Sequence, residues 1–462
     1  MNLPKTGFPM RAGLSKSEPK RLKDWQDNKV YEQVLKKNEG HKKFVLHDGP
    51  PYANGPIHIG HAMNKISKDM INRYWMMQGY EVPYVPGWDC HGQPIEHKVE
   101  EKLGTEKFNQ TSTAKIRELC NKFAVENIEL QKAGFRRLGV LGDWDNPYLT
   151  LYHQHDAADI EVFKAMFDKG MIYRGHKPVH WCKHCHTALA EAEIEYSDET
   201  SPSIFVRFEM TSKPAGLENF DGPVDFIIWT TTPWTLPSNT ALAVGPAIEY
   251  VKVKCRNPYT DEPQTVILAK DLVASYFTKK IEGSYQITGE SWMGPELEGI
   301  RYEQLIPWVK PTGDAFRVIV GDYVTTSDGT GIVHIAPTFG ADDDRVAKAA
   351  GIAPLFMVDK AGKNQPMVDK QGKFFVLEDL DPEFVKNNID VEKYKEYAGR
   401  YVKNAYDPEI ACDAETTLDI DLAVMLKAQN KAFKIEKHTH SYPHCWRTDK
   451  PVLYYPLDSW FI

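Results

Sequence analysis

The sequence predicts an α/β protein that is interrupted by an inserted, β-barrel-like domain. Residues 44–47 are typical of a short buried strand, and residues 63–77 carry apolar side chains at helical spacing. From about Ser203 onward the chain changes to short runs of β-branched and aromatic residues separated by turns. A β-rich stretch between α/β segments is typical of an inserted domain. The clearest runs are residues 203–208, 225–229, 250–255, 265–268, 316–320 and 331–335.

Length and composition narrow the class of protein. A chain of 462 residues exceeds one compact core, so we expect two or three domains. The sequence has no apolar run near the ~20 residues that span a bilayer, and its first residues lack the apolar core of a secretory signal, so we expect no membrane partner. Seven thinly spread cysteines favour a reducing cytoplasm over a disulfide framework. The net charge of −8 does not favour non-specific nucleic-acid binding.

The first motif lies where the predicted strand passes into the predicted helix. Prolines and glycines force a loop over residues 48–57, and His58 and His61 then fall on one side of the helix mouth. Unpaired backbone N–H groups and a partial positive charge favour anionic oxygens there. Gly60 leaves room for a flat adenine ring against the backbone. Alternatively, the histidines cap a surface helix or chelate a metal ion.

A second motif, Gly-Trp-Asp-Cys-His-Gly at residues 87–92, follows a predicted strand at residues 79–82. Ligands bind at such strand ends in α/β sheets. Asp89 could hold a substrate ammonium group there, or could be an ordinary turn residue. Together with His-Ile-Gly-His at residues 58–61, this motif resembles those of class I aminoacyl-tRNA synthetases. The resemblance is to the isoleucyl-tRNA synthetases in particular, because valyl and leucyl relatives carry different residues in the loop before His58 and in the Gly-Trp-Asp-Cys-His-Gly run.

This resemblance implies roles for individual residues. Asp89 would bind the amino group of isoleucine, and Pro50 and Trp460 would contribute to the pocket for its side chain. Mg²⁺ would accompany ATP. The residues that contact ATP would be His58, Gly60, His61 and Asn64, with His58 and His61 taking part in catalysis.

The resemblance also implies a Rossmann-like catalytic domain of the class I synthetases, here incomplete, with an editing domain inserted into it. Because the chain ends before a Lys-Met-Ser-Lys-Ser loop, we expect it to activate isoleucine poorly by itself. The predicted segments are a helical segment with the first half of the catalytic domain (1–197), the inserted editing domain (198–400), a connecting segment (401–439) and the return into the catalytic domain (440–462).

Two segments of the insertion resemble the editing site of isoleucyl, valyl and leucyl synthetases. A hydrophobic pocket gains only ~1–3 kcal/mol from one methylene, so a second site must hydrolyse valyl-tRNA(Ile). His334 would limit side-chain size, and Asp343 would hold the amino group, with Asp342 as a close competitor. Taken singly, the threonines could be turn and strand formers, and the acidic run a solvated loop or a Ca²⁺ or Mg²⁺ site. The residues around the terminal adenosine and the ester would be Thr230, Thr231, Thr232 and Asn239, with Thr231 and Asp343 catalytic.

The cysteines include half of a zinc-site pattern, Cys182-Lys-His-Cys185, on a predicted tight turn. Cys445 returns much later, but Thr448 stands where relatives carry a fourth cysteine. The three thiolates could hold a structural Zn²⁺ with His184, His186 or His444 as the fourth ligand. A metal-free knuckle is the alternative.

The resulting prediction is an isoleucine--tRNA ligase with an aminoacyl-tRNA hydrolase activity. Its partners would be isoleucine, ATP and tRNA(Ile), and we expect a monomer. Two other functions remain open, namely a stand-alone editing deacylase and a non-catalytic tRNA-binding subunit. Intact His58, His61 and Asp89 argue against a decayed activation site, and the absence of a basic stripe argues against a pure tRNA binder.

Overall fold

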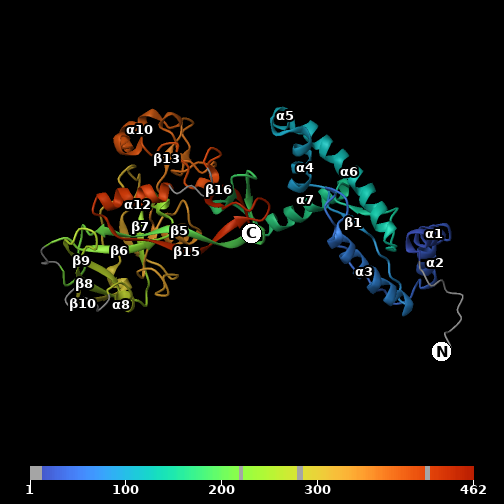
Figure 1. Cartoon of the computed structure of the whole chain (residues 1–462), viewed down its shortest axis with the longest axis horizontal. Coiled ribbons are helices and arrows are strands. Elements are labelled where there is room, and N and C mark those ends of the chain that lie inside the picture. Colours follow the sequence, from blue (N-terminus) through green and yellow to red (C-terminus); the bar gives the residue numbers. More distant parts are fainter. Residues whose placement is uncertain (1–12, 218–221, 278–284, 411–416) are drawn as a thin grey trace. The chain divides into compact units, whose positions relative to one another are not determined.

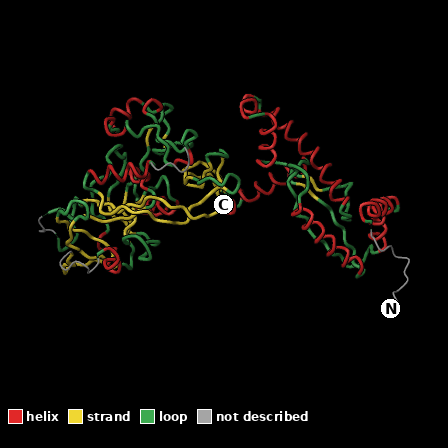
Figure 2. Tube along the Cα trace, viewed as in Figure 1, coloured by secondary structure: helices red, strands yellow, loops and turns green. Residues whose placement is uncertain are grey.

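A computed structural model describes residues 13–217, 222–277, 285–410 and 417–462 (Figure 1). The chain divides into two compact units, Met1–Ile172 and Tyr173–Ile462. Helices dominate the first unit and strands the second (Figure 2). The mixed α/β content predicted from the sequence is confirmed. The division into four segments and the closure of a barrel stay predictions.

Two helices of the first unit, α4 and α6, contribute to a core that includes Trp88, Phe123 and Phe135. A short parallel pair, β1 (Gly87–Trp88) and β2 (Tyr148–Leu149), places the second motif against this core. The helices are α1 (Leu14–Asp27), α2 (Val30–Lys37), α3 (Ile59–Met77), α4 (Gln93–Leu103), α5 (Thr105–Gln110), α6 (Thr113–Arg137) and α7 (His153–Asp168).

The helix predicted from residue 63 is confirmed as α3, whereas the strand predicted at residues 44–47 is wrong. This stretch is irregular, and a single parallel bridge joins Lys43 to Glu81. Val45 is 67% exposed, so the apolar run is not the buried strand that its composition indicates. A strand requires a paired neighbour as well as a suitable sequence, and the described part of the unit supplies only that one bridge.

The second unit is built on a six-stranded sheet with the order β10-β8-β9-β6-β5-β15. Its longest pair is antiparallel and joins β5 to β15 from Ile194 opposite Cys445 to Val206 opposite Ala432. All six predicted β-rich runs form strands. The strands of the six-stranded sheet are β5 (Ile194–Glu209), β6 (Asp225–Thr230), β8 (Glu249–Arg256), β9 (Pro263–Ala269), β10 (Tyr285–Met293) and β15 (Ala432–Cys445).

Three smaller sheets and several short helices complete this unit. The sheets have the orders β11-β7-β12, β16-β3-β4 and β13-β14. The remaining strands are β3 (Tyr173–Cys182), β4 (Thr187–Leu189), β7 (Ala241–Val244), β11 (Arg317–Val320), β12 (Ile332–Ile335), β13 (Met357–Val358), β14 (Asn364–Gln365) and β16 (Leu453–Phe461). The α-helices are α8 (Val273–Tyr276), α9 (Ala341–Ala350), α10 (Pro382–Asn388), α11 (Val391–Tyr394) and α12 (Leu418–Ala428).

One further element shapes the insertion, the 3₁₀ helix η2 (Pro233–Ser238), which follows β6 and is buried throughout. It directly follows Thr232, and its residues Trp234 and Leu236 pack in the main hydrophobic core. No helix among the described residues is long and apolar enough to cross a membrane.

Candidate functional sites

His58 and His61 form a stacked pair at the amino end of α3. His58 is the N-cap residue, and the two rings lie 3.8 Å apart between centroids. The Nδ1 of His58 accepts from the Gly60 N–H at 3.1 Å, and the Nδ1 of His61 accepts from the His58 N–H at 3.3 Å. Each neutral ring therefore carries its proton on Nε2. Burial, and then the neighbouring His58 and Lys65, lower the pKa of His61, so this ring is neutral at pH 7.

A cavity of about 260 Å³ opens beside this pair. It contains three of the four predicted ATP-binding residues, Gly60, His61 and Asn64, together with Pro50 from the predicted isoleucine pocket. His58 is not among its lining residues, and its ring stacks on that of His61. The complete lining is Gly49, Pro50, Pro51, Tyr52, Gly60, His61, Asn64 and Lys65.

Asp89 is joined to the same loop through its backbone. Its N–H donates to the Pro51 carbonyl at 2.9 Å, and its carbonyl accepts from the Ala53 N–H at 3.0 Å. The carboxylate itself is part-exposed and accepts a long hydrogen bond of 3.4 Å from the His91 N–H. Trp460 lies on β16 in the other unit, so its place in an isoleucine pocket stays a prediction.

A buried ion pair that was not predicted from the sequence lies at the start of this loop. Asp48 and Lys65 bind each other with both side chains only 3% exposed, and Lys68 contacts the second Asp48 oxygen at 3.1 Å. The Gly87 N–H also donates to Asp48 at 3.0 Å. Asp48 thereby connects the loop to α3, through the two lysines, and to β1, through Gly87. Asp89 is the residue that follows β1. The only signal in the sequence was an acidic residue at the start of a Pro/Gly loop.

A second cavity, of about 330 Å³, lies in the second unit beside the contact between β6 and β12. It contains Thr230, Thr231 and His334, three of the predicted editing residues. Thr232, Asn239, Asp342 and Asp343 are not among its lining residues. The other lining residues are Trp229, Tyr323, Thr325, Asp328, Gly329, Thr330, Gly331, Ile332 and Val333.

Hydrogen bonds among the threonines fix the state of His334. Thr235 donates its hydroxyl proton to the Thr232 carbonyl at 2.8 Å, and its oxygen lies 3.1 Å from Nε2 of His334. Since that hydroxyl has a single proton, Nε2 must be the donor and Nδ1 carries a lone pair. No partner for Nδ1 lies among the described residues. Burial lowers the pKa of His334 to about 4, so the ring is neutral.

Of the two competing carboxylates, Asp343 has the geometry of a site residue. Its oxygens accept from the Ala336 N–H at 2.9 Å and from the Tyr323 hydroxyl at 3.2 Å, and Tyr323 lines the cavity. Burial raises the pKa of Asp343 to about 6. Asp342 instead faces solvent and pairs with Arg345 at 3.3 Å.

Asn239 is held inside the protein. Its amide donates to the Ala241 carbonyl at 2.8 Å, and its oxygen accepts from the buried Tyr302 hydroxyl at 2.8 Å. Both the amide nitrogen and the amide oxygen therefore make hydrogen bonds inside the protein. The predicted contact with the terminal adenosine stays a prediction. Thr232 lies next to the cavity, with its hydroxyl 3.2 Å from that of Thr230.

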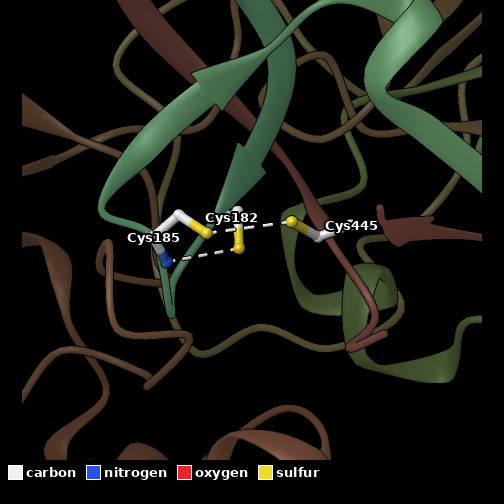
Figure 3. Close-up of side chains that lie close together, drawn as sticks. All are labelled: Cys182, Cys185 and Cys445. Carbon is white, nitrogen blue, oxygen red and sulfur yellow. Dashed lines mark hydrogen bonds between the residues drawn. The ribbon is translucent and has the colours of Figure 1, made fainter. Parts of the chain in front are cut away.

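The three cysteines of the predicted knuckle come together (Figure 3), with all three sulfurs within 4.8 Å of one another. Cys185 and Cys445 are 3.8 Å apart at sulfur, and two thiolates bound tetrahedrally to one zinc lie about 3.8 Å apart. Burial and the neighbouring thiols raise the pKa of Cys185 to about 12, so a cation would be needed to hold it as thiolate. The donor set therefore fits zinc.

None of the predicted histidines joins this cluster among the described residues. His444 is engaged by the Ser197 hydroxyl at 2.9 Å and by the Tyr442 carbonyl at 2.8 Å. The hydroxyl of Thr448 is 3.9 Å from the sulfur of Cys182. Thr448 therefore occupies the side of the cluster where the fourth cysteine was expected.

Sequence comparison shows which family the chain belongs to. The chain belongs to the class I tRNA synthetases, since the family described as tRNA synthetases class I (I, L, M and V) matches residues 20–462. Within that class it is similar to isoleucine--tRNA ligases. It is 45% identical over 97% of its length to those of Bacteroides fragilis and Porphyromonas gingivalis, and 43% identical over its whole length to that of Pasteurella multocida.

The chain spans 41% of the length of the first two of these relatives and 45% of the third. A solved complex of Agrobacterium radiobacter K84 LeuRS with tRNA is matched over 96% of this chain and 52% of that chain. Its identity is 16% and its TM-score 0.35.

Proposed function

We propose that this chain belongs to an isoleucine--tRNA ligase, which activates isoleucine with ATP and transfers it to tRNA(Ile). The observation that supports this most directly is the His58–His61 pair at the mouth of α3, beside a cavity that also contains Pro50. In the reaction, the isoleucine carboxylate attacks the α-phosphate of ATP, giving isoleucyl-adenylate and pyrophosphate. Mg²⁺ bound with ATP would offset part of the phosphate charge.

The residues present can stabilise this reaction by position and charge. The Nε2–H groups of His58 and His61 are donors for phosphate oxygens, and the α3 amino terminus adds a partial positive charge. Neutral rings provide these donors without a fixed charge that would trap pyrophosphate. Asp89 would bind the isoleucine ammonium group from the adjoining strand end, as the family resemblance implies.

Binding of a non-hydrolysable isoleucyl-adenylate analogue, measured by calorimetry, tests this activation site. We expect His61→Ala to weaken binding at least about tenfold, because a charge-assisted donor is lost. His97→Ala is the matched control, since His97 is an exposed histidine on α4 of the same unit. Equal affinities for wild type and His61→Ala would contradict the proposed ATP site.

We also infer that the β-rich part of the second unit is the editing domain, barrel-like as in the family, and hydrolyses valyl-tRNA(Ile). Support comes from the cavity that contains Thr230, Thr231 and the neutral His334, with Asp343 behind it. Thr231 would orient the ester or water, and Asp343 would hold the α-ammonium group. His334 would narrow the space for the aminoacyl side chain, so that valine fits and isoleucine does not.

Two assays on one sample separate the candidate functions. Isoleucine-dependent ATP–pyrophosphate exchange together with valyl-tRNA(Ile) hydrolysis supports a ligase. Because we expect this chain to activate isoleucine poorly, hydrolysis without exchange favours a deacylase only if the isoleucyl-adenylate analogue does not bind either. Neither activity with retained tRNA binding favours a tRNA-binding subunit. We infer that the partners are isoleucine, ATP and tRNA(Ile), and that the protein acts as a monomer in the cytoplasm.

We further infer one structural zinc at the knuckle, held by Cys182, Cys185 and Cys445. The fourth position would be taken by water or by the hydroxyl of Thr448. Its role would be to close the turn between β3 and β4 onto the end of β15.

A further inference from the structure

A buried carboxylate far away in the sequence accepts a hydrogen bond from the loop that follows Thr230, Thr231 and Thr232. Asp419, the second residue of α12, accepts the backbone N–H of Trp234 at 2.8 Å across 185 residues of sequence. Asp419 is 7% exposed and Trp234 is 4% exposed. Helix α12 packs against η2, so this bond lies inside the contact between the two elements.

The bond replaces a local helix cap that the loop itself does not make. The first residue of η2 is Pro233, which has no N–H, so Trp234 presents the first unpaired donor of this helix. A residue at the N-cap, here Thr232, commonly satisfies such a donor with its side chain. Thr232 makes no such cap bond.

Because Asp419 caps η2, the Thr232 hydroxyl can turn toward the site. It lies 3.2 Å from the hydroxyl of Thr230, a cavity residue, and 3.4 Å from that of Thr235, the partner of His334. Helix α12 has its own cap, since Thr417 accepts from the Ile420 N–H at 3.3 Å. The Asp419 carboxylate is therefore not required at the start of its own helix.

We propose that Asp419 is a positioning residue of the deacylation site, which caps η2 from α12 and thereby keeps the Thr232 hydroxyl directed at Thr230 and Thr235. This inference rests on the proposed hydrolysis of valyl-tRNA(Ile) in the insertion. Asp419 is not among the residues that line the cavity, so its effect passes through the loop.

Burial brings the ionisation of Asp419 close to neutral pH, and three charged or titratable groups face it. They are Lys403, Glu199 on β5 and Tyr442 on β15, with Lys403 and Glu199 paired at 3.2 Å. Burial raises the pKa of Asp419 to about 7, although Lys403 and the Trp234 N–H oppose this. Below that pH the protonated carboxyl is a weaker acceptor for Trp234.

The test compares Asp419→Ala, which removes the acceptor, with Asp419→Asn, which keeps an uncharged oxygen. Asp421→Asn is the matched control, because Asp421 is on the same helix but pairs with Arg400 and is 42% exposed. For valyl-tRNA(Ile) hydrolysis by the full chain, we expect Asp419→Ala to lower kcat at least about tenfold with little change in KM. The ratio of kcat for Asp419→Asn to wild type should rise from pH 8 to pH 6, because the amide oxygen does not titrate.

A second measurement does not depend on activity. Hydrogen exchange followed by mass spectrometry on the peptide that contains Pro233–Ser238 should be at least about tenfold faster in Asp419→Ala than in Asp421→Asn. Unchanged exchange, or wild-type kcat in Asp419→Ala, would overturn the positioning role. If wild type hydrolyses no valyl-tRNA(Ile), the proposed function fails, and the exchange rates alone decide whether Asp419 orders the loop. If Asp419→Ala does not fold, the pH-dependent ratio for Asp419→Asn decides.

Discussion

Acid should destabilise the second unit through His334, and the size of the effect follows from its burial. The pKa of this histidine falls from 6.5 to about 4 because the ring is enclosed in the core. As pH falls through 6.5, the unfolded chain takes up a proton that the folded protein accepts only near pH 4. Stability is therefore fully present above pH 6.5 and is lost progressively as pH falls toward 4. A pKa difference of about 2.5 corresponds to about 3 kcal/mol in the free energy of unfolding.

The change that isolates this effect is His334→Gln, which keeps an N–H donor for Thr235 and cannot titrate. Urea unfolding at pH 7 and pH 4.5 gives the loss of stability in each protein. The loss should be smaller in His334→Gln than in wild type by most of that ~3 kcal/mol. His176→Gln is the control, since His176 lies in the same unit with its side chain 49% exposed. Equal acid losses in wild type and His334→Gln would refute the argument that the ring is held neutral.

Three other predictions concern Asp343, the cysteine cluster and the Asp48–Lys65 ion pair. Asp343→Ala should abolish hydrolysis of valyl-tRNA(Ile), because the carboxylate proposed to hold the α-ammonium group is lost; hydrolysis as fast as in Asp342→Ala would contradict this. Metal analysis of the purified protein should find close to one zinc per chain, and Cys445→Ser should lower it; less than about a tenth of a zinc in wild type would end the zinc hypothesis. Lys65→Met leaves Asp48 buried with Lys68 as its remaining cation and should lower the free energy of unfolding of the first unit by about 3 kcal/mol; a negligible change in urea unfolding would show that Lys68 alone compensates the charge.

Local sequence was sufficient for the elements that carry the predicted motifs. The helix mouth at His58 depends on a Pro/Gly loop followed by helical spacing. The helix predicted over residues 63–77 is present as α3, which begins four residues earlier, at Ile59. The β-rich runs of the insertion also formed strands, because alternation and turn residues act over a few residues. The strand predicted at residues 44–47 failed because burial of Val45 depends on a paired neighbour, which composition does not reveal.

Which of two similar residues lies at a site could be told only from the tertiary structure. Asp342 and Asp343 are adjacent in sequence, yet one pairs with exposed Arg345 and the other accepts from Tyr323 at the cavity wall. The cysteine motif likewise predicted three sulfurs but not which group stands beside them. The structure places the Thr448 hydroxyl near Cys182, whereas His444 is used by Ser197.

The sequence by itself determined the family resemblance, the helix at the first motif and the β-rich character of the insertion, since these depend on neighbouring residues. Only the tertiary structure decided the Asp48–Lys65 pair, the tautomer of His334 and the cap that Asp419 provides to η2. The physical reason is that a buried charge or an unpaired N–H must find its partner wherever the chain brings one. Spacing along the sequence does not specify that partner.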